Sequence, residues 1–180
     1  DQELLRKVQL VQLDILIEFD RICKINNLKY QLFAGTLLGA IRHNGFIPWD
    51  DDVDVAMLRS DYEKFLDICN DYLSPDYFLQ TYETDSNYYR QFARIRKNNT
   101  KYLQKGYKDL DIHHGIFIDI FPMDNVKPYS FVGRFHLWLC YLVRIITSSM
   151  DKSRCYRAKN PLTKYSRLFL YYFTKLFPKK

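Results

Sequence analysis

The sequence predicts an α+β fold (mixed α/β), in which a small mixed sheet is flanked by helices and a basic helical C-terminal part follows. Three observations indicate it: apolar residues at helical spacing in the first 25 residues, short strand-like runs between 30 and 121, and basic helical stretches after 130. Of the 180 residues, 47% are hydrophobic and 27% charged, which excludes disordered and collagen-like chains. We expect one compact unit.

The first predicted element is a long amphipathic helix over residues 3–25. Its apolar residues recur three or four positions apart, and Asn26-Asn27 ends it. A short strand over 30–34 then leads into a helix over 37–43, which the turn signal Asn44-Gly45 closes.

The next predicted element is an acidic strand that ends at Met57. Ser60 is the expected N-cap of the helix that follows, because Glu63 then stands in the capping-box position. Pro122 is expected to end the last strand, since it has no N–H for a sheet hydrogen bond. The remaining elements are a helix at 60–72, strands at 77–82, 88–96 and 115–121, and helices at 131–149 and 161–177.

Charge is distributed unevenly along the chain. The net charge is 27 − 21 = +6, but residues 127–180 hold 12 Lys/Arg and the single acid Asp151, a net of +11. Residues 1–126 hold 15 bases and 20 acids, a net of −5. We therefore expect an acidic core over 1–126 and a basic aromatic segment over 127–180. That segment either packs on the core with an exposed basic rim or contacts an anionic membrane, and nucleic acid is not an expected partner.

Cysteine usage and hydropathy bear on the compartment. The four cysteines are far apart and form no CxxC or Cys/His cluster, which argues against a zinc site and a disulfide framework. No run of 18 apolar residues occurs and the first 25 residues are charged throughout, so the sequence as it stands shows neither a spanning helix nor a signal peptide. We expect a cytoplasmic protein, with any membrane contact at the inner membrane face.

The strongest functional signal is the run Trp-Asp-Asp-Asp-Val-Asp-Val-Ala-Met at 49–57. Side chains of a strand alternate between its faces, so Asp50, Asp52 and Asp54 share one face at a spacing of about 7 Å. Neighbouring charges at that spacing repel by roughly 2 kcal/mol at an effective dielectric constant of about 20, so a compensating cation is expected. Oxygen ligands favour Mg²⁺ or Mn²⁺. The alternative is an exposed acidic turn with solvated charges.

A further acidic residue, Asp119, lies within an apolar run at 115–121, where burial is expected. An unpaired buried carboxylate costs several kcal/mol, so Asp119 needs a metal, a base or hydrogen bonds. If its strand lies beside the acidic one, Asp52, Asp54 and Asp119 converge as three metal ligands. The alternative is a structural aspartate that caps backbone groups or pairs with an arginine.

The third feature is Gly35-Thr36, where a predicted strand enters a helix. Backbone N–H groups and the positive end of the helix can bind an anion there, and Gly35 would let a phosphate approach closely. Thr36 and His43 lie along one side of this helix, and Arg42, at an angle to them, could reach a phosphate or simply cap the helix. A Gly-Thr pair alone is more often an ordinary turn.

Two long segments resemble the signatures of a known family. The run Gly-Thr-Leu-Leu-Gly-Ala-Ile-Arg-His-Asn-Gly-Phe-Ile-Pro-Trp-Asp-Asp-Asp-Val-Asp-Val-Ala-Met at 35–57 resembles the first signature of the LicD family, and His-Gly-Ile-Phe-Ile-Asp-Ile-Phe-Pro-Met-Asp at 114–124 looks like the second. The resemblance implies membership of the nucleotidyltransferase superfamily and makes 1–126 its catalytic core. The superfamily positions are then Gly35, Thr36, Asp52, Asp54 and Asp119.

The resemblance further implies an enzyme that takes phosphocholine from CDP-choline and attaches it to a cell-surface glycan such as teichoic acid or lipopolysaccharide. Fukutin-related protein is similar at the Pro-Trp-Asp-x-Asp-x-Asp segment and moves ribitol phosphate from CDP-ribitol, so the alcohol stays open. In the implied mechanism the metal neutralises diphosphate charge, and a hydroxyl of a glycan, lipid-linked in one version, attacks the phosphorus that bears the alcohol while CMP leaves. LicD proteins usually continue beyond this length with a further motif near a Tyr-Gly pair.

The residue roles expected from that mechanism are as follows. Asp52 and Asp54 are expected to be metal ligands, and Asp119 a further ligand or the general base. Arg94 and Arg96 either hold phosphate or cytidine or are solvated charges of an edge strand. Trp49 either stacks on a base or a choline ammonium, or packs against its neighbours. The expected substrate-binding residues are Gly35, Thr36, Arg42, His43, Trp49, Asp50, Arg94 and Arg96.

Two other functions compete with this one. A true nucleotidyltransferase would use the same metal site to move NMP from an NTP to a small acceptor. An inactive binding module would keep the fold without metal-dependent chemistry.

Overall fold

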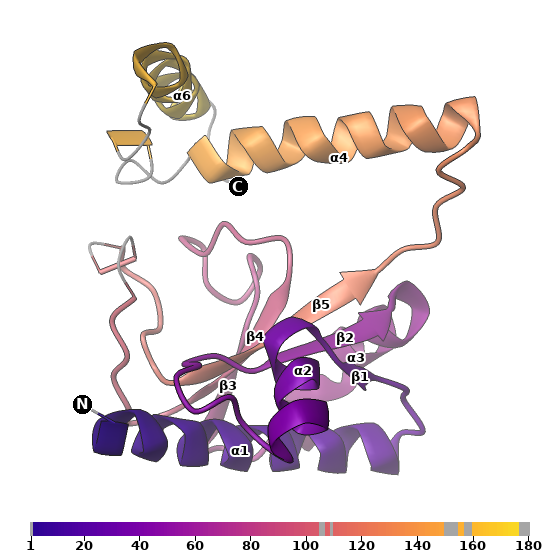
Figure 1. The fold of residues 1–180 in the computed structure, drawn as a ribbon, viewed down its shortest axis with the longest axis vertical. Helices are drawn as coiled ribbons and strands as arrows, with labels where there is room; N and C mark the ends of the chain where they lie inside the picture. The colour runs from indigo at the N-terminus through magenta and orange to yellow at the C-terminus, as the bar shows by residue number, and fades with distance from the viewer. Residues whose placement is uncertain (1, 105–106, 109, 150–154, 157–159, 177–180) are drawn as a thin grey trace. The chain divides into compact units, whose positions relative to one another are not determined.

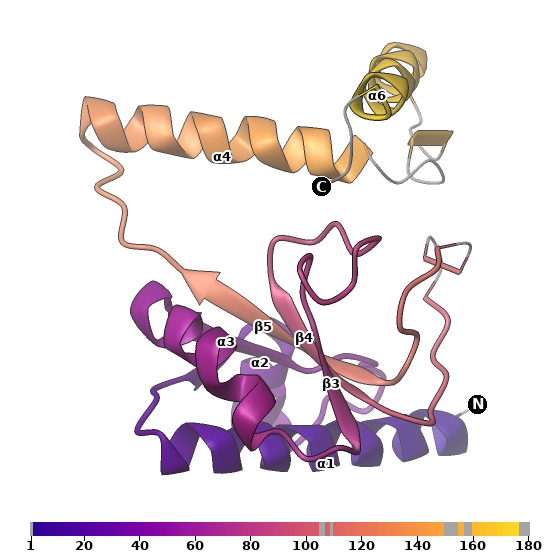
Figure 2. The same ribbon diagram turned by 180° about the vertical axis from the view of Figure 1, so that it is seen from behind.

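The computed structural model describes residues 2–104, 107–108, 110–149, 155–156 and 160–176, and it divides the chain into two compact units (Figures 1 and 2). The first unit comprises the chain up to Tyr102 together with Ile112–Asp124. The second comprises Leu103–Asp111 together with the chain from Asn125 onward.

The first unit contains a five-stranded mixed sheet, which confirms the predicted α+β class. The strand order is β1-β2-β5-β4-β3; β2 and β5 pair in parallel and the other neighbours pair antiparallel. Strands β2 and β5 therefore meet at the centre of the sheet, although β3 and β4 lie between them in sequence. The strands are β1 (Gln31–Leu32), β2 (Asp54–Leu58), β3 (Tyr77–Gln80), β4 (Ala93–Lys97) and β5 (Phe117–Met123).

Helices α1 (Gln2–Ile25) and α3 (Arg59–Tyr72) share one hydrophobic core with the sheet. Phe19 of α1 and Phe65 of α3 meet edge to face at 5.1 Å between ring centroids, and both are fully buried. Alternate strand residues join this core, namely Val55, Met57, Leu79, Ala93, Ile95, Ile118 and Ile120, together with Val53 just before β2. The alternate residues consequently face the other side of the sheet.

Helix α2 (Ala34–His43) follows β1 directly and ends at Asn44, which adopts the left-handed conformation expected of a helix C-cap. Figure 1 shows α2 in front of the sheet, whereas α3 is in front in the reverse view of Figure 2. Gly39 lets the segment after α2 fold back against the helix, because a Cβ there would lie 2.6 Å from the backbone oxygen of Gly45.

Several predicted boundaries are wrong; the strand predicted at 88–96, for example, begins only at Ala93. Helix α3 begins at Arg59, so Ser60 lies inside it and the N-cap position belongs to Leu58, which makes no side-chain cap. Helix α2 begins three residues earlier than predicted. Strand β5 continues through Pro122. The Asp119 N–H donates to the carbonyl oxygen of Val53, the residue just before β2, so alternation turns the Pro122 nitrogen toward β4, whose pairing with β5 reaches only Ile120.

The second unit contains α4 (Phe131–Ser149) and α6 (Pro161–Thr174), as the sequence predicts. Pro161 occupies the first turn of α6, and the side chain of Asn160 caps it by accepting from the Leu162 N–H at 2.9 Å. Both helices expose large apolar side chains, among them Phe131 (87%), Trp138 (53%) and Phe169 (69%). Among the described residues, neither these helices nor any other is both long and apolar enough to cross a membrane.

Candidate metal and substrate site

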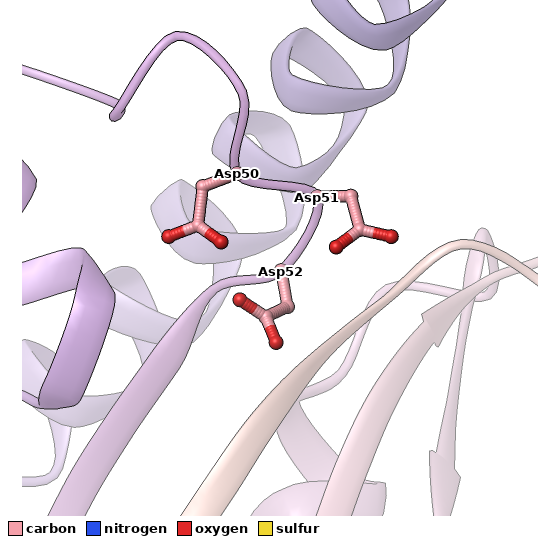
Figure 3. Close-up of side chains that lie close together, drawn as sticks. All are labelled: Asp50, Asp51 and Asp52. Atoms are coloured by element: carbon pink, nitrogen blue, oxygen red, sulfur yellow. The ribbon is translucent and has the colours of Figure 1, made fainter.

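The acidic run folds differently from the predicted continuous strand. Strand β2 begins only at Asp54. The side chains of three aspartates, Asp50, Asp51 and Asp52, project from a short bend just before this strand (Figure 3). Each of the three offers a carboxylate oxygen, and these oxygens all lie within 4.8 Å of one another. Asp50 and Asp52 are half-buried and Asp51 is exposed. Sequence reasoning missed Asp51, because strict alternation would place it on the opposite face.

Two buried glutamines of α1 hold this bend in place. The Gln9 amide donates to the carbonyl oxygens of Ile47 at 3.2 Å and Asp50 at 2.9 Å. The Gln12 amide donates to the Asp51 carbonyl at 2.8 Å, and both side chains are at most 3% exposed. Sequence reasoning missed them too. The available signal was two amides three positions apart among the apolar residues of an amphipathic helix.

The first turn of α2 lies against the start of β2. The pairing of β1 with β2 ends at Val55. The next N–H of this segment, that of Asp54, donates at 2.8 Å to the hydroxyl of Thr36 in α2. Gly35 faces the bend: a Cβ there would lie 2.6 Å from Oδ2 of Asp50. Gly35, Thr36, Asp50 and Asp54 are thus brought together.

The second predicted acid, Asp119, stands beside Asp54. The strand register pairs Asp54 with Asp119 and Asp119 with Arg94, which puts the three in one row on the face opposite the core. Arg94 holds the Asp119 carboxylate through two hydrogen bonds, from Nε at 2.6 Å and from a terminal nitrogen at 3.2 Å. Both residues are buried, at 3% and 8% exposed, which is the arginine pairing that the structural alternative predicts. A metal-binding or catalytic role of Asp119 stays a prediction.

The carboxylates of this region oppose one another electrostatically. Burial is the main cause that raises the pKa of Asp52 to about 6, and the negative charges of Asp50 and Asp51 contribute further. Burial, followed by the charges of Asp52 and Asp119, raises the pKa of Asp54 to about 7. Burial also raises the pKa of Asp119, and Arg94 acts against that shift. A hard dication would relieve this repulsion, so the donor set fits Mg²⁺ or Mn²⁺.

Arg94 and Arg96 are not solvated charges of an edge strand. Strand β4 lies between β5 and β3, and Arg96 is only 2% exposed. Its guanidinium donates to Oε1 of Gln80 at 2.5 Å and to the Gly115 carbonyl at 2.6 Å. Burial lowers the pKa of Arg96 to about 10. Contact of either arginine with phosphate or cytidine stays a prediction.

The remaining predicted residues lie at the far end of α2. Arg42 and His43 occupy its last turn, about 9 Å along the helix axis from Thr36. The His43 ring meets the Trp49 ring edge to face at 6.0 Å, and Trp49 is 73% exposed. A role for them in substrate binding stays a prediction. A tyrosine that the sequence did not point to, Tyr102, donates its hydroxyl to Oδ2 of Asp51.

Comparison with known proteins agrees with this geometry. The family model described as "LicD/FKTN/FKRP, nucleotidyltransferase domain" matches residues 27–138, which is more than half of the chain. The chain is 41% identical over 124 residues to the lipopolysaccharide cholinephosphotransferase LicD of Haemophilus influenzae, covering 68% of this chain and 45% of that protein.

Shorter matches link the chain to two uncharacterized rickettsial proteins. One, from Rickettsia typhi, is 51% identical over 43 residues, which cover 24% of this chain and 14% of the relative. The other, from Rickettsia prowazekii, is 56% identical over 36 residues, which cover 20% of this chain and 14% of the relative. The chain thus aligns with less than half of the length of each of these relatives. The two sequence signatures agree with the sheet on which they lie and with the family match. The chain therefore belongs to the LicD family.

Proposed function

We propose that this protein is a Mg²⁺-dependent transferase that moves phosphocholine, or a related alcohol phosphate, from a CDP-linked donor to a hydroxyl of a cell-surface glycan and releases CMP. The observation that carries the proposal is the acidic bend of Asp50, Asp51 and Asp52, set against the first turn of α2, in a chain that is 41% identical to a cholinephosphotransferase over 124 residues. Mn²⁺ is the alternative ion.

The metal ligands in this proposal come from the start of β2. Asp52 belongs both to the predicted ligand pair and to the cluster of the bend. Asp54, the first residue of β2, lies outside that cluster, and the charge of Asp52 acts on it. Asp50 and Asp51 offer further oxygens within 4.8 Å of Asp52. A dication bound here would neutralise the charge of the donor diphosphate. Asp119 is either a further ligand or the base that takes the hydroxyl proton, and Arg94 orients it.

The transfer itself forms one bond and breaks another. An acceptor hydroxyl oxygen bonds to the phosphorus that bears the alcohol, the bond from that phosphorus to the CMP oxygen breaks, and a base takes the hydroxyl proton. The N–H groups of the first turn of α2 would hold donor phosphate oxygens beside Gly35 and Thr36. In this mechanism the chain positions the donor and compensates the negative charge of its phosphates. Positioning and charge stabilisation are the main contributions of a protein to phosphoryl transfer.

Donor turnover tests the proposal. Incubation with CDP-choline, CDP-ribitol or CDP-glycerol and Mg²⁺ should release CMP, and chelation should stop it. Asp52→Asn should lose turnover while unfolding cooperatively as the wild type does. Absence of CMP release from every donor, with or without an added glycan, would contradict the proposal.

A true nucleotidyltransferase is the second candidate, because the family that matches residues 27–138 is described as a nucleotidyltransferase domain. Its mark is transfer of NMP from an NTP with release of pyrophosphate. An inactive binding module would instead show no metal-dependent shift in melting temperature, and Asp54→Ala would behave as the wild type.

The acceptor and the place of action follow from the same proposal. The H. influenzae relative is named for lipopolysaccharide, and we propose a comparable glycan, lipid-linked during its assembly, as the acceptor. The net charge of +11 over residues 127–180 and the exposed aromatic residues of α4 support peripheral contact of a cytoplasmic protein with the anionic inner membrane face. Sedimentation with anionic vesicles, but not with neutral ones, tests this contact.

A further inference from the structure

A small apolar pocket adjoins the acidic bend, since Asp50 and Asp52 are among its lining residues. Its volume is about 120 Å³, and its walls come from α1, β1, α2 and the segment between α2 and β2. Among the described residues that line it, only Thr36, Asp50 and Asp52 have polar side chains. The Thr36 hydroxyl already accepts the Asp54 N–H. The apolar walls include Leu13, Leu16, Leu32, Ala40, Phe46 and Ile47.

We propose that this pocket binds the trimethylammonium group of a choline-bearing donor, an inference that rests on the proposed transferase function. A quaternary ammonium has no N–H to donate and spreads its charge over methyl groups. It is therefore suited by apolar and aromatic walls with anionic groups nearby. The pocket offers that combination, because Phe46 and several aliphatic residues line it together with Asp50 and Asp52.

The size of the pocket agrees with this ligand. An apolar protein cavity of about 150 Å³ takes up benzene, which has six heavy atoms. A trimethylammonium group has four, a nitrogen and three methyl carbons, so a pocket of about 120 Å³ can enclose it.

The position of the pocket agrees as well. Asp50 and Asp52 belong both to its wall and to the acidic bend that would face the diphosphate. In choline only two carbons separate the phosphate oxygen from the ammonium nitrogen. A head-group site for choline must therefore adjoin the phosphate site.

The same walls disfavour a polyol. Each hydroxyl of ribitol or glycerol that entered the pocket would give up hydrogen bonds to water, and the aliphatic walls supply no partner. A buried hydroxyl without a hydrogen-bond partner weakens binding. The pocket therefore selects among CDP-alcohols, which the acidic bend alone would not do.

Calorimetric titration of CDP-choline, CDP-ribitol and CDP-3,3-dimethylbutanol, with Mg²⁺ present, tests the inference. The last compound replaces the ammonium nitrogen by carbon and so keeps the shape without the charge. CDP-choline should bind at least about tenfold more tightly than CDP-ribitol. The isostere should bind more weakly than CDP-choline, because it loses the attraction to Asp50 and Asp52.

Two tryptophan variants of α1 form a matched pair. Leu13 lines the pocket and is 39% exposed, whereas Leu10, one turn away and 50% exposed, does not line it. Leu13→Trp should remove most of the preference for CDP-choline, and Leu10→Trp should keep it. If Leu13→Trp unfolds, Ala40→Leu fills the pocket from α2 instead.

CMP release, measured in parallel, separates the two proposals. Preferential turnover of CDP-ribitol would overturn the choline pocket and leave the transferase standing. Choline-selective binding that depends on Leu13, without CMP release from any donor, would support the pocket and overturn the transferase. Equal affinity for CDP-choline and its neutral isostere, or an unchanged preference in Leu13→Trp and Ala40→Leu alike, would overturn the assignment of the pocket.

Discussion

The two faces of the sheet in the first unit use neighbouring residues for different purposes. On one face, alternate residues such as Val55 and Ile120 are fully buried against α1 and α3. On the other, Asp54, Asp119 and Arg94 form a row of charged side chains across three strands. Because alternation along each strand separates the two sets by a single residue, the apolar face can stabilise the fold while the charged face retains groups that repel one another.

The free energy of unfolding and the binding of ligands should therefore depend on different faces of the sheet. Substitutions on the apolar face should reduce the free energy of unfolding and leave ligand binding by the folded protein unchanged. Substitutions on the charged face should affect ion binding and turnover more than the fold, except where a buried charge loses its partner.

The largest effect on stability is expected from Phe65→Ala in α3, within the core that covers the apolar face. Its ring is fully buried and packs on Phe19, so the truncation should cost about 4 kcal/mol through lost burial and a cavity. Denaturant unfolding measures the loss. Tyr72→Ala, at a residue of the same helix that is 42% exposed, is the control and should cost less than about 1 kcal/mol. A changed Mg²⁺ affinity of folded Phe65→Ala would break the separation of the faces.

The buried ion pair is the exception on the charged face. Arg94→Met leaves Asp119 buried without the partner that it has in the structure, and should cost about 3 kcal/mol. The double variant Arg94→Met/Asp119→Leu should recover most of that stability, since an apolar pair of similar volume replaces a buried ion pair at little cost. Urea unfolding of the single and double variants gives the coupling. Simple addition of two losses would contradict this account.

A smaller effect is expected from Gln12→Leu, which tests how α1 supports the bend. The variant removes the donor to the Asp51 carbonyl and should cost about 1–2 kcal/mol. Mg²⁺ affinity should fall about tenfold, because the carboxylates of the bend lose their support. Calorimetry measures the affinity. The same substitution at exposed Gln2 is the control and should leave both quantities unchanged.

The smallest expected effect is a pH dependence of the metal-free protein. The raised pKa values of Asp52, about 6, and Asp54, about 7, mean that the folded state binds more protons than the unfolded state between about pH 4 and 7. This contribution to stability is therefore lost as pH rises through that window. Because both carboxylates are partly exposed, solvent screening reduces the loss to an amount on the order of 1 kcal/mol. Melting temperatures between pH 5 and 8 test this. Asp54→Asn should flatten the profile, and an identical slope in that variant would contradict the cause.

Much of the fold and part of the site could be predicted because their signals are local. The period of the apolar residues sufficed for the first helix, and the alternation of Val53, Asp54 and Val55 assigned each to its face. Gly35 and Thr36 were predicted from a strand that enters a helix. These features depend on residues within one or two elements, and a sequence displays them directly.

The supporting residues could not be predicted in the same way. Gln9 and Gln12 reach backbone carbonyls about forty residues away, and their role exists only once α1 lies under the bend. Tyr102 likewise meets Asp51 only in the folded chain. Their amide and hydroxyl groups carry no motif of their own, so sequence reasoning took Gln9 and Gln12 as unremarkable positions of a helix.

By itself the sequence determined the types of the elements and the acidic run, because periodicity and short-range order are written along the chain, and two long segments of it resemble the signatures of the LicD family. Only the tertiary structure decided which acids meet, that Asp119 faces both Asp54 and Arg94, and that an apolar pocket adjoins the bend. The physical reason is that alternation assigns a side chain to a face. The register between strands distant in sequence, set by packing of the shared core, assigns it a neighbour.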